Sequence, residues 1–331
     1  MLQSNLQRLD AREEHFRIPG PRANLQLFLR HLPAMTSSAR GPRIVLYVHG
    51  ATFPSALSIA HCFAGYSWRD ALCEAGFDVW GFDFYGFGGS DRYPQMTEPA
   101  EAHSPLCRCE DAAAQIASVV RFILDHHAMP RLSIIAHSWG SIAACRFAGQ
   151  HAASVDRLVL FGPIARRPPR RYEAPPSAPA WRIVTLEDQW LRFVEDVPSH
   201  AAAVLSRVDF DEWGQRYLDS DPQSRSRDPV GVKVPTGPFA DILQAWHGRL
   251  GYEPGLVRAP VALIRGEWDG LIPDEDAHWL FDAFAASPIK RDIKISCATH
   301  LMHLETMRFA LYRESVAFLD GDDEAPLSRR P

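Results

Sequence analysis

The strongest constraint on the fold of this chain is a series of short apolar segments that alternate with longer segments of helical periodicity. The apolar segments cover residues 43–50, 77–84, 131–138, 155–163, 261–269 and 289–300. The helical segments cover residues 67–76, 111–127, 141–152, 275–286 and 304–319. Strands this apolar are typical of a sheet that is covered on both faces. The alternation therefore predicts right-handed βαβ crossovers and a mostly parallel sheet.

Two further segments, 15–20 and 24–33, precede this series and predict a leading antiparallel hairpin. With them, the expected fold is of the α/β class, with a mostly parallel eight-stranded sheet flanked by helices.

The alternation stops after Gly162. Residues 165–180 are rich in proline and arginine, which excludes a regular element there. The chain from Trp181 to about Gly255 is helix-like and rich in tryptophan, and strand character returns only at Val261. We therefore expect the following domains: a core of residues 1–162 and 258–320, a helical insertion of residues 163–257, and a disordered tail of residues 321–331.

Composition excludes several classes of function. The 331 residues carry a net charge of −5 with both signs interspersed, so no basic surface for nucleic acid is expected. No apolar run reaches the roughly 18 residues of a membrane span, and the first residues lack the apolar stretch of a signal peptide. The six scattered cysteines predict reduced thiols and a cytoplasmic protein. Cys107 and Cys109 have no second ligand pair nearby, so we predict no metal.

The stretch SIIAHSWGS, residues 133–141, places Ser138 where a buried strand meets a helix. Ala136 and Gly140, two residues to either side, are small enough for strand and helix to approach closely. A serine on such a turn projects its Oγ above the sheet. The backbone N–H of Trp139 would point into the same space and stabilise an oxyanion.

Four segments, taken in this order, resemble the α/β-hydrolase family over nearly the whole chain. They are HGAT at 49–52, FDFYGFGGSDR at 82–92, the Ser138 turn, and the pair RGEWDGLIP at 265–273 and ATHLMHLE at 298–305. Haloalkane dehalogenases and soluble epoxide hydrolases of this family carry an aspartate nucleophile where this chain has Ser138. The resemblance therefore does not extend to these two groups. The glycine-rich loop at 86–89 does not open a helix, which excludes a dinucleotide fingerprint, and no cofactor is expected.

The resemblance implies a catalytic triad. Serine needs an adjacent base, histidine suits that task, and a carboxylate orients the histidine. By resemblance the acid is Asp269, with Glu267 as the alternative, and the base is His300, with His303 as the alternative. The backbone N–H groups of Ala51 and Trp139 would form the oxyanion hole, with Thr52 as a neighbouring candidate.

The insertion matches the position of the family's cap over the active site. Its tryptophans suggest an apolar ceiling for the substrate, although they could equally form the cap's own small core. The predicted pocket residues are Thr52, Phe53, Trp181, Trp190 and Trp213.

We therefore predict a serine hydrolase that cleaves a carboxylester, lactone or thioester bond of a small, largely apolar substrate through an acyl-enzyme. The alternatives are a carbon–carbon bond hydrolase, a lyase or a perhydrolase on the same triad, and a ligand-binding receptor with the hydrolase fold. The expected partner is a small-molecule substrate, and a homodimer is left open.

Overall fold

The computed structural model describes residues 8–36, 41–168 and 178–321. An eight-stranded sheet runs through it in the order β1-β2-β4-β3-β5-β6-β9-β10. The strands are β1 (Glu14–Pro19), β2 (Gln26–Leu32), β3 (Arg43–Val48), β4 (Phe77–Asp83), β5 (Leu132–His137), β6 (Val155–Phe161), β9 (Val261–Gly266) and β10 (Lys290–Ile295). Strand β2 pairs antiparallel with β1 and β4, and all other pairs are parallel. The predicted fold class and eight-stranded sheet are confirmed.

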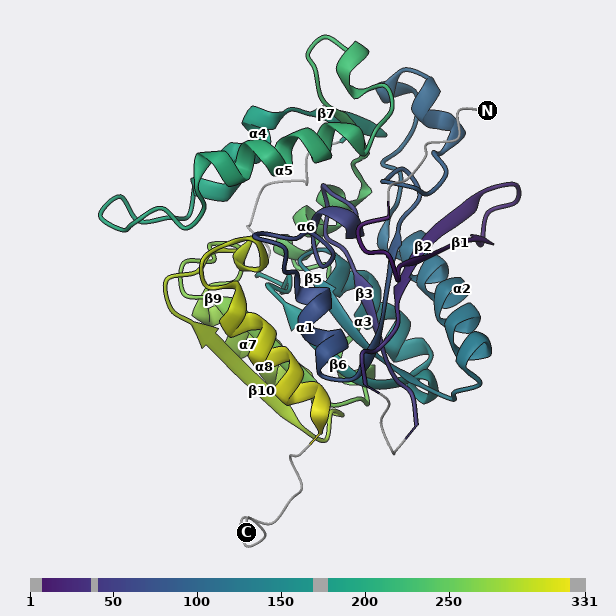
Figure 1. Ribbon diagram of the computed structural model, residues 1–331, viewed down its shortest axis with the longest axis vertical. Coiled ribbons are helices and arrows are strands. Elements are labelled where there is room, and N and C mark those ends of the chain that lie inside the picture. The colour runs from purple at the N-terminus through teal and green to yellow at the C-terminus, as the bar shows by residue number, and fades with distance from the viewer. Residues whose placement is uncertain (1–7, 37–40, 169–177, 322–331) are drawn as a thin grey trace, which may run out of the picture.

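Helices cover both faces of the sheet (Figure 1). They are α1 (Trp68–Glu74), α2 (Cys109–His127), α3 (Gly140–Gln150), α7 (Asp274–Ala283) and α8 (Arg308–Asp320). Alternate residues of the central strands face opposite sides. On β3, Val45 and Tyr47 belong to the core under α1 and α8, whereas Leu46 and Val48 belong to the core under α2, α3 and α7. Burial on both faces explains why these strands read as unbroken apolar runs.

The insertion between β6 and β9 holds the helices α4 (Leu186–Val194), α5 (Arg207–Asp219) and α6 (Gly237–Trp246). Figure 1 shows α4 and α5 above one end of the sheet. The prediction that this stretch lacks strands is wrong, because β7 (Trp181–Val184) and β8 (Val232–Pro235) form a two-stranded antiparallel sheet. Each strand is four residues long, too short for its periodicity to be told from a helical turn.

Short 3-10 helices connect the elements, at Ser55–Leu57, Pro94–Thr97, Ala100–Ala102, Ala152–Ser154, Ser224–Ser226, Pro254–Leu256 and Met302–Leu304. The predicted strands 261–269 and 289–300 end early, at Gly266 and Ile295, and their last residues form loops at the carboxyl edge of the sheet. Parts of two predictions, residues 169–177 of the proline-rich stretch and 322–331 of the tail, lie outside the described residues. In the part of the chain described, no helix combines the length and apolarity needed to cross a bilayer.

Candidate active site

The site is built around the turn between β5 and α3, where Ser138 has a φ of +55°. A side chain makes this left-handed conformation unfavourable, by about 1–3 kcal/mol. The turn is held at both ends: the Ser138 N–H donates to the Phe161 carbonyl at 2.9 Å, and the Ser141 N–H donates to the Ser138 carbonyl at 2.9 Å. A Cβ at Gly140 would lie 2.4 Å from the His49 carbonyl oxygen, so only glycine fits where α3 meets the end of β3.

Two loops at the carboxyl edge of the sheet bring a histidine and an aspartate to this serine. His300 Nε2 lies 2.8 Å from Ser138 Oγ, and His300 Nδ1 lies 3.0 and 2.9 Å from the two carboxylate oxygens of Asp269. All three residues are buried. The Leu271 N–H donates to Asp269 Oδ1 at 3.0 Å, which fixes the carboxylate from its other side. The structure therefore brings the three predicted catalytic residues into one hydrogen-bonded chain.

A glycine makes room for this arrangement. Gly162, directly after β6, has a φ of +52°, and a Cβ there would lie 2.9 Å from His300 Nδ1 and 3.1 Å from Asp269 Oδ2. Any other residue at position 162 would therefore displace the imidazole of His300 and the carboxylate of Asp269.

The two alternative residues lie elsewhere. Glu267 Oε2 accepts a hydrogen bond from the Cys297 N–H at 3.1 Å, on the outer side of the loop. His303 is buried with no hydrogen-bond partner on either ring nitrogen in the described structure, and its ring lies 4.7 Å from that of His137. Burial lowers the pKa of His303 well below its ordinary value. Neither residue contacts the Ser138 hydroxyl in place of the predicted ones.

His137, next to the serine, supports the base. Its Nε2–H donates to the His300 carbonyl oxygen at 3.1 Å, and its ring stacks on Phe161 at 4.6 Å. Burial lowers the pKa of His137 well below its ordinary value, and its closeness to the rings of His303 and His300 acts in the same direction. The ring of His137 is therefore uncharged near neutral pH. It does not compete with His300 for the negative charge of Asp269.

The two amides predicted for the oxyanion hole are both free to bind an oxyanion. Neither the N–H of Ala51 nor that of Trp139 donates to an acceptor within the described residues. His49 braces the loop that carries Ala51: its Nδ1–H donates to the Gly50 carbonyl at 2.8 Å, and its Nε2 accepts from the Phe84 N–H at 3.0 Å. The Trp139 indole N–H donates to Asp241 of α6 at 3.0 Å, which ties the turn to the insertion.

A small cavity lies against the Ser138 hydroxyl. It is lined by Gly50, Ala51, Thr52, Phe53, His137, Ser138, Arg192 and Leu301. Its volume of about 10 Å³ is close to the space that one water molecule needs. Ligand pockets are typically of about 300–1,000 Å³, so the site is closed as it stands.

Of the predicted pocket residues, Thr52 and Phe53 line this cavity and the three tryptophans do not. Trp213 packs edge-on against Phe53 at 5.2 Å, and its indole N–H donates to the Leu57 carbonyl. Trp190 packs against Phe210 at 4.9 Å. Trp181 donates to the Glu98 carbonyl at 3.1 Å and lies under the Lys233 ammonium. Trp190 thus packs within the insertion, Trp213 packs between Phe53 of the core and Phe193 and Phe210 of the insertion, and Trp181 lies against Lys233.

Four cavity residues were not predicted from the sequence, Gly50, His137, Arg192 and Leu301, and of these Arg192 is the one from the insertion. It lies on α4, which begins with a capping box of Thr185 and Asp188. In the sequence, one signal could have indicated that Arg192 faces the core. It lies next to Phe193 and three residues after Gln189, and both of these residues are buried. Arginine on a surface helix is ordinarily solvated, so periodicity alone favours the opposite interpretation.

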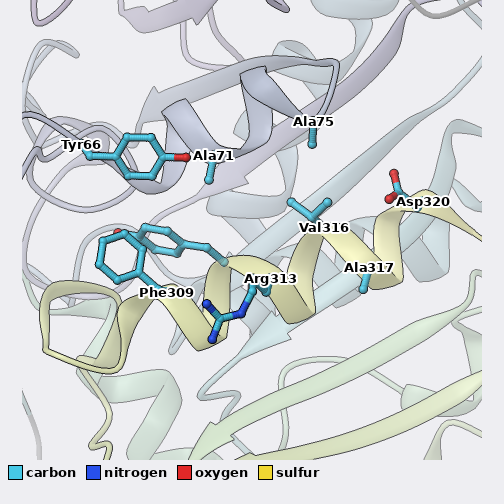
Figure 2. A pocket seen from close by; sticks show the side chains of 9 residues that line it. Tyr66, Ala71, Ala75, Phe309, Arg313, Val316, Ala317 and Asp320 are labelled. Carbon is cyan, nitrogen blue, oxygen red and sulfur yellow. The ribbon is translucent and has the colours of Figure 1, made fainter.

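A larger pocket, of about 370 Å³, lies between α1 and α8. Figure 2 shows Tyr66, Ala71 and Ala75 on one side of it and residues of α8, such as Val316 and Ala317, on the other. Its lining contains no serine, cysteine or histidine, so it offers no counterpart of the Ser138–His300 pair.

The described residues include one group with the composition of a metal site, His31, Asp78 and His127. His31 Nε2 is 3.2 Å from Asp78 Oδ1, and His127 Nε2 accepts the Trp80 indole N–H at 3.0 Å. His31 and Asp78 are thus partners of each other and His127 is a partner of Trp80, and no hydrogen bond links this group to Ser138, Asp269 or His300 in the described structure.

Comparison with known proteins agrees with this fold. The family described as alpha/beta hydrolase fold matches residues 45–306. A search of curated proteins found no match. Solved structures with the same fold include a thioesterase domain from the curacin biosynthetic pathway, which is 17% identical with a TM-score of 0.58 and covers 93% of this chain and 99% of its own.

Two other similar structures are an esterase and a lipase. The thermophilic esterase from Thermogutta terrifontis is 16% identical with a TM-score of 0.57, over 93% of this chain and 98% of its own. The monoacylglycerol lipase from Paleococcus ferrophilus is 19% identical with a TM-score of 0.55, over 88% of this chain and 98% of its own. At these identities the likeness establishes the fold.

Proposed function

This chain belongs to the alpha/beta hydrolase fold family, and from that premise we propose that it is a serine hydrolase acting on an ester-like bond through an acyl-enzyme. The bond is a carboxylester, lactone or thioester of a small molecule. The observation that carries the proposal is the continuous hydrogen-bonded chain from Ser138 through His300 to Asp269, with links of 2.8 and 2.9 Å.

In the first half of the reaction, Ser138 Oγ attacks the scissile carbonyl carbon and its proton passes to His300 Nε2. The carbonyl oxygen becomes an oxyanion, which the N–H groups of Ala51 and Trp139 stabilise. Asp269 holds the Nδ1–H of His300 and stabilises the imidazolium. His300 then gives its proton to the leaving group, the bond to the carbonyl carbon breaks, and the acyl group remains on Ser138.

In the second half, water replaces the serine as the nucleophile. His300 takes a proton from the water as its oxygen attacks the acyl carbon. The second tetrahedral intermediate collapses, Ser138 recovers its proton from His300, and the free acid leaves. No cofactor is needed to balance either half.

Access of the substrate depends on the insertion, because the cavity holds about one water molecule and α4 supplies part of its wall. A substrate therefore enters when α4 moves away from the loop that carries Ala51. Closure over the bound substrate would exclude bulk water and strengthen the electrostatic interactions at the carbonyl.

The test compares wild type with Ser138→Ala on p-nitrophenyl esters of increasing acyl length, together with labelling by a fluorophosphonate. We expect the label on Ser138 by mass spectrometry and a loss of turnover of at least about 10³-fold in the variant. Ser118→Ala, a partly exposed serine of α2, is the matched control and should retain full activity. An adduct elsewhere, or undiminished turnover by Ser138→Ala, would reject the proposal, and tight ligand retention without turnover would favour the receptor alternative.

A further inference from the structure

Arg192 lines the candidate active-site cavity and has no ion-paired carboxylate among the described residues. Arg192 is partly buried as a residue, and its Nε is fully buried with no hydrogen-bond partner in the described structure. Glu195 and Asp196 are close enough to affect it through space, but neither forms a hydrogen bond or ion pair with it in the part of the chain described. Burial lowers the pKa of Arg192, and the nearby charges of Glu195 and Asp196 offset this only in part.

Several other arginines of the interior have carboxylate partners: Arg30 and Arg69 with Glu13, Arg108 with Asp241, Arg167 with Asp276, Arg227 with Asp221, and Arg265 with Asp274 and Asp292. Arg92 has no carboxylate partner in the described structure, but its guanidinium donates to the backbone carbonyls of Gly88, Ser90 and Ser220. A buried cation without an anion is unfavourable, because the protein interior does not replace its hydration. Arg192 therefore does not serve as one half of a structural ion pair. It is available to bind an anion.

Of the acidic groups close to Arg192, Asp269 and Asp196 are held by other donors, whereas Glu195 is exposed to solvent and forms no ion pair with Arg192 in the described structure. Both oxygens of Asp269 are held by His300, and one also accepts the Leu271 N–H. Asp196 Oδ2 accepts the Gly270 N–H at 3.3 Å. The anion consequently comes from outside the described chain.

The cavity also limits where the anion lies. Arg192, Ser138 and Ala51 line the same space of about 10 Å³, so a group bound by Arg192 is a few bonds from a carbonyl carbon attacked by Ser138. A planar carboxylate matches the guanidinium fork, which donates two parallel hydrogen bonds.

We propose that Arg192 binds a carboxylate of the substrate, which makes the preferred substrate an ester or thioester that carries a carboxylate within a few bonds of the scissile carbonyl. This inference rests on the proposed function, and it replaces the expectation of a largely apolar substrate with an anionic one. Arg192 acts as the specificity-determining residue from the insertion, and closure of α4 brings it to the substrate.

The test measures kcat/KM, as acid release at constant pH, for monoethyl succinate and for its neutral isostere ethyl 4-methylpentanoate. The wild type should prefer the anionic ester. In Arg192→Met the ratio of anionic to neutral kcat/KM should fall about 10- to 100-fold, the value of a charge-assisted hydrogen bond. Arg207→Met, which removes the same charge from an exposed position on α5, should keep the wild-type ratio. An ester with its carboxylate on the alcohol side, acetylglycolate, shows on which side of the bond the anion lies.

Equal losses on both esters in Arg192→Met, or a wild type that prefers the neutral ester, would overturn the inference. Binding of free succinate to Ser138→Ala, by calorimetry, separates the inference from the proposed function because it needs no turnover. Succinate binding that disappears in Ser138→Ala/Arg192→Met supports the anion site even if no ester is hydrolysed. Hydrolysis that depends on Ser138 but not on Arg192 supports the proposed function alone. Arg192→Lys should recover part of the binding, because it keeps the charge but not the fork.

Discussion

At the scale of single residues, the site depends on which nitrogen of His300 faces which partner. The carboxylate of Asp269 accepts from Nδ1, which leaves Nε2 as the acceptor for the Ser138 hydroxyl. The neighbouring rings of His137 and His303 add no positive charge near neutral pH, because burial lowers the pKa of each well below its ordinary value. The orientation of His300 therefore depends on one carboxylate.

Asp269→Asn removes that carboxylate at nearly unchanged volume. The amide can donate to Nδ1 and so favour the wrong tautomer of His300, and it cannot stabilise the imidazolium. We expect kcat on a p-nitrophenyl ester to fall about 10³- to 10⁴-fold with little change in KM. Glu267→Gln, a carboxylate two residues away that bonds the Cys297 N–H instead, is the control and should stay near wild type. The opposite ranking of the two variants would assign the acid to Glu267.

At the scale of elements, the serine is placed by how closely α3 approaches the end of β3. Gly140 is the first residue of α3, and its missing side chain lets the helix contact the His49 and Val48 carbonyls. The loop after β3 carries Ala51, so the same contact sets the distance between the two amides that we propose for the oxyanion hole. A small residue is therefore required at this junction for two reasons. It lets α3 pack against the end of β3, and it fixes the position of the backbone N–H groups beside Ser138.

Gly140→Ala tests this junction. The added Cβ would lie 2.4 Å from a backbone oxygen that cannot rotate away, so strand and helix must separate. We expect a loss of about 1–3 kcal/mol in the free energy of unfolding, by chemical denaturation, and a fall in kcat. Gly149→Ala, later in the same helix, would place its Cβ 3.3 Å from the side chain of the exposed Leu256 and should be tolerated. Equal tolerance of both substitutions would contradict the close approach.

At the scale of the whole molecule, a buried ion network ties the first strands to α1. Glu13, directly before β1, forms ion pairs with Arg30 of β2 and Arg69 of α1 and a hydrogen bond with His15. Burial by itself would raise the pKa of Glu13, but the His15 bond and the two guanidinium charges outweigh it and lower the pKa to about 2. The network thus joins three elements that are distant in sequence.

The lowered pKa predicts a pH dependence of stability. A carboxylate with a depressed pKa in the folded state stabilises the protein above its ordinary pKa near 4.5, and this stability is lost as the pH falls toward 2. The difference corresponds to about 3 kcal/mol. Glu13→Gln should cost about 3–5 kcal/mol at pH 7, because two buried guanidinium groups lose their partner. It should also lose less stability than the wild type between pH 5 and pH 2, by urea denaturation.

The matched control is Glu212→Gln, which removes an exposed i,i+4 partner of Arg216. Exposed pairs contribute at most about 1 kcal/mol, so its curve should follow the wild type at every pH. A Glu13→Gln variant as stable as this control at pH 7 would show that the network does not hold the elements together.

The sequence by itself determined the core of the fold. Apolar runs such as 43–50 and 131–138 have few stable arrangements other than strands covered on both faces, so their alternation with helices sufficed to predict the parallel sheet. The hydrolase motifs, in their order along the chain, sufficed for the family, and they pointed to Ser138, Asp269 and His300 as the residues to place together. These inferences need only local pattern and chain order, and both are written in the sequence.

The tertiary structure decided what depends on contacts between distant residues. The strands β7 and β8 are too short to show a period, and they exist because each pairs with the other across some fifty residues. Trp181, Trp190 and Trp213 do not line the cavity, whereas Arg192 does, although side-chain type favours the reverse. Which face of an amphipathic helix covers a site is set by the position of its whole element, and local sequence carries almost no information about that position.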